Sequence, residues 1–95
     1  MFEKLKQFKD LREKAKNLQG ILAEEKVEGS AAWGKLKMVM NGNQEVLSVS
    51  VDAELLNDKN KLQDAIKEVT NDAIKKAQKV MANKMMQDGG FKMPM

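Results

Sequence analysis

Cysteine, histidine and tyrosine are absent from this chain of 95 residues, and proline and tryptophan occur once each. Without cysteine the chain has no disulfide framework and no thiolate metal site. Without histidine it has no Ser-His-Asp catalysis and none of the common zinc sites. Its serines have no neighbouring base, its carboxylates lack EF-hand spacing, and it has no glycine-rich phosphate loop. We therefore expect no enzymatic activity, no metal or other cofactor, and no small-molecule substrate.

Long hydrophobic runs are also missing. No apolar stretch approaches the roughly 20 residues that span a bilayer. The first six residues are interrupted by charge and lack the apolar stretch of a signal peptide. We expect a cytoplasmic protein with no membrane partner.

The length fits one small domain over residues 1–95. A domain of this size buries only roughly 60–65% of the surface that its unfolded chain exposes. Because disulfides and structural zinc are unavailable, we expect oligomerisation to supplement the core.

Charge is dense but unevenly distributed. A third of the residues are charged and the chain carries a net charge of +3. Residues 1–26 have a net charge of +2, residues 27–58 of −3 and residues 59–95 of +4. The two ends of the chain are basic and the middle is acidic, an asymmetry that the total conceals.

The first segment predicts a helix over about residues 2–25. Lysine, glutamate, glutamine and leucine dominate it, and all of them favour helix. Its apolar residues recur in steps of three and four, the spacing of a helix seam: Phe8, Leu11, Ala15, Leu18 and Leu22. Because one narrow stripe cannot stabilise a helix alone, we expect the seam to pack on a partner helix or a sheet.

The middle segment, about residues 26–52, changes to the alternating period of strands. It predicts two antiparallel strands over about 35–41 and 44–51, and a shorter strand at 26–30 directly after the first helix. Asn41-Gly42-Asn43 is a strong hairpin signal, because Asn and Gly tolerate positive φ. Three strands with one apolar face need a cover, which the helices supply.

The last segment returns to helix, over about residues 58–88, and Asn57 or Asp58 is placed to cap it. A Gly-Gly pair then ends the helix before a tail at 89–95. The apolar stripe of this helix consists of Leu62, Ile66, Val69, Ala73, Ala77 and Val80. The whole chain is thus predicted to be an α+β domain, in the order helix, three antiparallel strands, helix.

Both helices carry candidate sites for an anionic partner. On the first helix, four cations form one narrow stripe beside the seam: Lys6, Lys9, Arg12 and Lys16. The stripe is about 15 Å long, which suits several phosphates along one edge of a duplex groove. On the last helix the candidates are Lys75, Lys76 and Lys79. Asp72 is spaced to pair with Lys75 or Lys76. Such lysines are also common on plain solvated faces. On the first helix the pattern alone favours that plain interpretation, and on the last helix it does not separate the two.

The single tryptophan and the methionines also allow either a structural role or a role in binding. Trp33 lies between the first two strands, where it could stack on a base, but packing or a dimer contact is the more usual role in a small domain. Met81, Met85 and Met86 are expected to close the core at the helix end or to line a subunit contact.

Several motifs occur together in a fixed order. They are the hairpin over 35–51, Val51-Asp52-Ala53-Glu54-Leu55-Leu56, Asn71-Asp72-Ala73 and the tail Gly90-Phe91-Lys92-Met93-Pro94-Met95. With the helix–hairpin–helix order, they make nearly the whole chain resemble the YbaB/EbfC family of small bacterial nucleoid-associated proteins. The chain departs from that pattern at Ala31-Ala32-Trp33-Gly34, where the family is usually glycine-rich, and at Ala53, where it usually has proline.

The resemblance implies an intimate homodimer of tweezer-like shape, with the sheets at the centre and paired helices projecting. It also implies binding to duplex DNA with little sequence requirement, a place in the nucleoid, and effects on DNA conformation, nucleoid organisation and gene expression. We accordingly predict that the seven cations named above contact phosphates.

Two alternatives remain open at this stage. A net charge of +3 is low for a nucleoid protein, and acidic groups interrupt each basic face. The chain could therefore be a protein–protein adaptor that uses its helical seams and its Met-rich helix end. A basic first helix could also lie on an anionic membrane, but Lys4 falls within its apolar sector, which argues against that.

Overall fold

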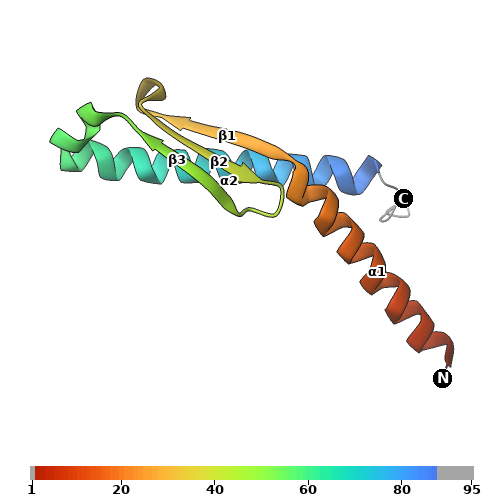
Figure 1. The fold of residues 1–95 in the computed structure, drawn as a ribbon. Coiled ribbons are helices and arrows are strands. Elements are labelled where there is room, and N and C mark those ends of the chain that lie inside the picture. Colours follow the sequence, from red (N-terminus) through yellow and green to blue (C-terminus); the bar gives the residue numbers. More distant parts are fainter. Residues whose placement is uncertain (1, 88–95) are drawn as a thin grey trace.

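The computed structural model describes the backbone of residues 2–87 and the side chains of residues 6–87. The predicted order is confirmed (Figure 1): α1 Phe2–Glu24, β1 Lys26–Ala31, β2 Leu36–Asn41, β3 Val46–Val51 and α2 Lys59–Gln87. Short 3₁₀ turns at Ala32–Gly34 and Ala53–Asn57 join β1 to β2 and β3 to α2. The predicted tail at 89–95, and residue 88 of the predicted helix, lie outside the described residues.

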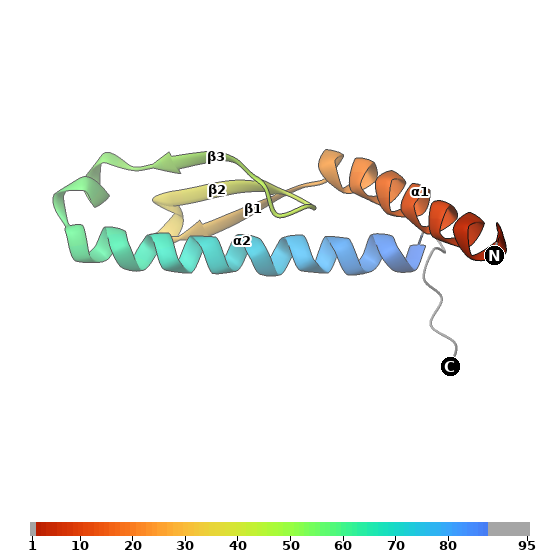
Figure 2. The same cartoon turned by 90° about the horizontal axis from the view of Figure 1, so that it is seen from below.

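The three strands form one antiparallel sheet in the order β1-β2-β3. Gly29 of β1 pairs with Met38 of β2, which in turn pairs with Val49 of β3. Helix α2 runs along one face of this sheet, beside β1 and β2, as Figure 2 shows. The molecule therefore has two layers, a sheet and one long helix, with α1 outside both.

Small side chains on α2 allow the two layers to approach closely. Ala65, Val69, Ala73 and Ala77 are buried, and together with Leu36, Met38 and Met40 of β2 they form most of the core. A Cβ added to Gly29 would lie 2.7 Å from the carbonyl oxygen of Val69 and 2.9 Å from the Cβ of Ala73. Glycine is thus required where β1 crosses the helix.

The predicted stripe of α2 is mostly correct. Val69, Ala73 and Ala77 are buried as expected, but Ile66 is half exposed and Ala65 takes the inward position instead. The prediction of an N-cap is confirmed at Asp58, whose carboxylate accepts the backbone N–H of Lys61.

The β2–β3 turn lies where the sequence predicted it, but the physical reason is different. Within this turn, the residue with a positive φ is Gln44, at 63°, and not Asn41, Gly42 or Asn43. Gly42 is needed for close packing: its N–H donates to the carbonyls of Leu22 and Glu25, and an added Cβ would lie 2.9 Å from Leu22. Buried Asn41 holds the turn, because its side-chain oxygen accepts the backbone N–H groups of Asn43 and Glu45.

Helix α1 extends away from the sheet and from α2 (Figure 1). Its last turns are anchored where Leu22 is buried against the β2–β3 turn, whereas Phe8 is 70% exposed and Leu11 56% exposed. The expectation that the seam of α1 packs on a helix or sheet is therefore met within the chain at Leu22 and not at Phe8 or Leu11. The projecting helix makes the molecule elongated, with extents of 63 × 25 × 19 Å.

Trp33 corrects another expectation. It does not pack against the described residues: its side chain is fully exposed at the tip of the β1–β2 connection. Three consecutive residues there, Ala32, Trp33 and Gly34, have φ values of 53°, 60° and 83°. This left-handed turn leaves the indole exposed, away from the core.

Candidate nucleic-acid interface

The four cations predicted on α1 lie on the projecting part of that helix. Lys6, Lys9, Arg12 and Lys16 are all exposed, as their spacing relative to the apolar seam requires. Ion pairs between described side chains involve Lys35, Lys37, Lys76 and Lys84, none of which lies on α1. The stripe is therefore presented to solvent with its charge available to a ligand.

The cations predicted on α2 fall into two groups. Lys75 and Lys79 are exposed on the outer side of the helix. Lys76 instead turns toward the sheet, where its ammonium group donates to the carbonyl oxygen of Glu28 at 2.8 Å and pairs with Asp72 at 3.2 Å. The structure therefore separates Lys76 from Lys75 and Lys79 and gives it a contact within the fold.

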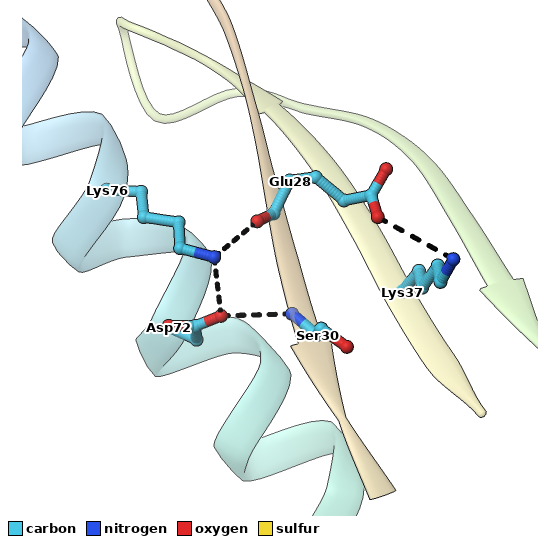
Figure 3. A network of polar contacts seen from close by, with 5 residues as sticks. All are labelled: Glu28, Ser30, Lys37, Asp72 and Lys76. Atoms are coloured by element: carbon cyan, nitrogen blue, oxygen red, sulfur yellow. Dashed lines mark hydrogen bonds and ion pairs between the residues drawn. The ribbon is translucent and has the colours of Figure 1, made fainter. Parts of the chain in front are cut away.

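Asp72 and Lys76 together bind the outer edge of β1, as Figure 3 shows. The carboxylate of Asp72 accepts a hydrogen bond from the backbone N–H of Ser30 at 3.0 Å. The ammonium group of Lys76 donates to the backbone carbonyl of Glu28, two residues earlier in the strand. These backbone groups belong to an edge strand, which without partners would be open to pairing with another chain. The predicted pairing of Asp72 with Lys76 is thus confirmed, but its role in closing the β1 edge was not predicted.

Two pKa values report these contacts. The hydrogen bond from the backbone of Ser30, and after it the one from Lys76, lowers the pKa of Asp72 below its ordinary value. On the other side of the fold, the carboxylate of Glu54 raises the pKa of Lys35 through a hydrogen bond and its charge. Lys35 is solvent-exposed and Asp72 is partly exposed, so these shifts describe local structure rather than a reactive site.

A further ion pair, Lys84 with Glu25 at 3.1 Å, connects the end of α2 to the junction of α1 and β1. It is the kind of contact that sequence patterns miss, since the two residues are far apart along the chain. The junction from which α1 projects is therefore held by Glu25 as well as by the buried Leu22.

The described residues offer exposed charged groups to a ligand. No group of three or more acidic, histidine or cysteine side chains that could hold a metal ion is found within residues 6–87. Nor is either helix, as far as it is described, long and apolar enough to cross a membrane. What the surface offers is cations at helical spacing, which recognise phosphates by charge and carry no base-specific information by themselves.

Known proteins resemble this chain over most of its length. Residues 1–90 match the model of the YbaB/EbfC DNA-binding family. A nucleoid-associated protein of Syntrophobacter fumaroxidans is 40% identical over 96 residues, covering 98% of this chain and 87% of the relative. A nucleoid-associated protein of Dictyoglomus thermophilum is 37% identical over 86 residues, covering 88% of this chain and 83% of the relative.

The fold also has a solved counterpart. The crystal structure of the uncharacterized protein HP0035 from Helicobacter pylori superposes with a TM-score of 0.78 at 21% identity, covering 95% of this chain and 98% of that one. At 21% identity this likeness shows a shared fold and no more. Membership of a family is shown by the sequence matches. By these matches the chain belongs to the YbaB/EbfC DNA-binding family.

Proposed function

We propose that this protein is a nucleoid-associated, DNA-binding homodimer that contacts duplex DNA through phosphates, with little requirement for sequence. The family to which the chain belongs and the names of its relatives support the DNA-binding role. Through such binding it would act in the nucleoid on DNA conformation, nucleoid organisation and gene expression.

The observation that carries the proposal is the exposed stripe of Lys9, Arg12 and Lys16 on a helix that projects from the body. A projecting helix brings its cations to the phosphates without a clash between the sheet and the duplex. Lys6 extends the same stripe, and Lys75 and Lys79 add exposed cations on α2. Lys76, although part of the predicted set, is held by Asp72 and Glu28 and would contribute less.

Apolar side chains left uncovered by the single chain support the homodimer. Val49 and Val51 pair with Met38 and Leu36, so they face the same side as the core, yet they remain 52% and 41% exposed because α2 covers β1 and β2. The edge of β1 is closed by Asp72 and Lys76, whereas β3 is the other edge of the sheet. A second copy would therefore cover β3, so that Val49 and Val51 become part of a core shared by the two chains.

The DNA contacts are tested by replacing the stripe and by a charge-matched control. We expect the triple variant K9A/R12A/K16A to weaken binding to unrelated duplex sequences equally, and to make the salt dependence shallower by about 1 for each phosphate that the variant can no longer bind. The control K26A/K59A/K61A removes the same charge from exposed positions off the stripe. Equal weakening in the two variants would contradict a specific role of the stripe and leave only net charge.

The dimer is tested on the two faces of one strand. In sedimentation experiments we expect V49K/V51K to dissociate the dimer, because the charges would enter its apolar core. The control S48K/S50K places the same charges on the opposite face, since Ser48 and Ser50 pair with Val39 and Lys37. A wild-type protein that sediments as a monomer, or a dimer that survives V49K/V51K, would contradict this part of the proposal.

A further inference from the structure

Helix α1 is attached to the rest of the fold at its carboxyl end. A single residue, Glu25, separates it from β1. Among the side chains of α1 that the structure describes, Leu22 alone is buried. One buried contact is a pivot about which a helix can turn, so the direction of α1 must be set by other contacts around that pivot.

The β2–β3 turn supplies the first of these contacts. The last carbonyl groups of a helix have no hydrogen-bond partner within the helix. The N–H of Gly42 donates to the carbonyls of Leu22 and Glu25, at 2.9 and 3.0 Å. The side-chain amide of Asn43 donates to the carbonyl of Gln19, about one turn earlier, at 2.9 Å. A turn that is distant in the sequence therefore caps the end of α1.

The end of α2 supplies the other contact. The ammonium group of Lys84 pairs with the carboxylate of Glu25 at 3.1 Å. The two side chains are only 30% and 38% exposed, and salt screens a partly buried pair less than an exposed one. The residue between α1 and β1 is thus held from two sides, by the β2–β3 turn and by α2.

We propose that Asn43 and Glu25 are positioning residues for DNA binding, which hold α1 in the direction that presents its cations to the duplex. The inference rests on the proposed function, because the stripe of Lys9, Arg12 and Lys16 lies on this helix. Neither Asn43 nor Glu25 touches DNA in this role. Both act through the backbone at the base of α1.

The length of α1 makes its base important. Gln19 lies three residues, or about 4.5 Å, from Leu22, whereas Lys9 lies thirteen residues, or about 20 Å, from it. A shift of about 1 Å at Gln19 therefore moves Lys9 by about 4 Å, which exceeds the length of a hydrogen bond. Loss of the contacts at the base would leave every cation of the stripe in place but spread the stripe over many directions.

Distances between two spin labels in the free protein test this directly. The chain has no cysteine, so labels can be attached through Q7C on α1 and Q78C on α2, both at exposed positions. Labelled chains are diluted with unlabelled ones, so that each measured distance lies within one chain. We expect E25A/N43A to broaden the distance distribution by about 4 Å, because α1 then turns about its pivot.

Two further variants separate positioning from general damage. The control E24A/N60A removes the same two groups from exposed positions away from these contacts and should keep the wild-type distribution. The charge swap E25K/K84E keeps the wild-type net charge and restores an ion pair, so it should narrow the distribution that E25K alone broadens. An unchanged distribution in E25A/N43A, or equal broadening in the control, would overturn the positioning role.

The sign of the effect on DNA binding tests the consequence. Glu25→Ala removes an acidic group, so charge alone would strengthen binding to duplex DNA. We expect weaker binding instead: if α1 holds the competent direction in about a tenth of the molecules, the affinity falls about tenfold. The salt dependence should match that of the wild type, because no cation has been removed. Glu24→Ala removes the same charge next to it and should bind at least as tightly as the wild type.

The inference is contradicted if E25A binds duplex DNA as tightly as E24A while the wild type binds normally. A wild type that binds no duplex at all would instead contradict the proposed function, and the positioning role would fall with it. Because the distances are measured without DNA and the affinities include the wild type, the two failures are distinguishable.

Discussion

Gly29 lies where β1 passes closest to α2, and the missing side chain sets the distance between the two layers. The space for a Cβ is already taken by the backbone of Val69 and by Ala73. Neither obstacle is a flexible side chain, so relief would require the strand or the helix to move. The sequence alone marks Gly29 only as an interruption of a short strand, since the obstacle comes from α2.

Gly29→Ala should therefore destabilise the fold by about 1–3 kcal/mol through overpacking. The matched control is Gly20→Ala on α1, where nothing lies within 4 Å of the added methyl group and helix propensity changes by up to about 1 kcal/mol in favour of the variant. Urea unfolding of both variants measures the difference. Equal stabilities would show that the layers are looser than described.

Asp72 is the other residue whose role depends on tertiary structure. Its pKa is lowered because the carboxylate form accepts hydrogen bonds from Ser30 and Lys76. A carboxyl group whose pKa falls on folding stabilises the protein above the pKa of the unfolded chain, and this contribution disappears as the pH falls through the folded-state pKa.

Asp72→Asn replaces the carboxylate by a neutral group of the same shape. We expect the variant to be less stable than the wild type at neutral pH, and the two to converge as acid protonates Asp72 below its ordinary range. Thermal melts from pH 7 to pH 2 measure the convergence, with Asp64→Asn, at an exposed position two turns earlier, as the control. A difference that stays constant down to pH 2 would contradict the ionic part of this contact.

At the scale of elements, the sequence predicts more than its composition suggests. The change from helical to alternating period locates all five main elements, and Asp58 marks the start of α2. Prediction stops where a feature depends on two distant segments. The inward turn of Lys76 requires β1 beside α2, the close contact of Gly42 requires Leu22, and the exposure of Trp33 requires three left-handed residues in a row.

Helix α1 is the element with the most unequal packing. Leu22 is buried and its carbonyl accepts the N–H of Gly42 at 2.9 Å, so it anchors the helix to the β2–β3 turn. The exposed part, which carries the basic stripe, depends on that anchor for its direction.

Leu22→Ala should cost about 2–5 kcal/mol of stability, as expected for a large-to-small change at a buried site. Leu11→Ala, at an exposed position of the same seam, should cost less than about 0.5 kcal/mol at protein concentrations where the chain is monomeric. Denaturation at low and high protein concentration measures both. A cost of Leu11→Ala that grows with concentration would indicate that a partner chain covers the seam, whereas equal costs at low concentration would contradict the packing described.

At the scale of the whole molecule, the modest net charge conceals a division of charge between the sheet and the helices. The acidic middle segment forms the sheet and its turns, and the basic ends form the helices. One helix lies on the sheet and contributes Lys76 to the fold, while the other projects and leaves its cations exposed. A dimer would repeat this arrangement twice, with uncovered apolar surface at β3 for the contact and two projecting helices for DNA.

The central claim is that DNA is bound through phosphates, and a titration with one duplex at several salt concentrations tests it most directly. If about six phosphate contacts form, the logarithm of the association constant should fall linearly with the logarithm of the salt concentration, with a slope of about −5. An affinity that does not change with salt, or no binding at about 50 mM salt, would contradict the account.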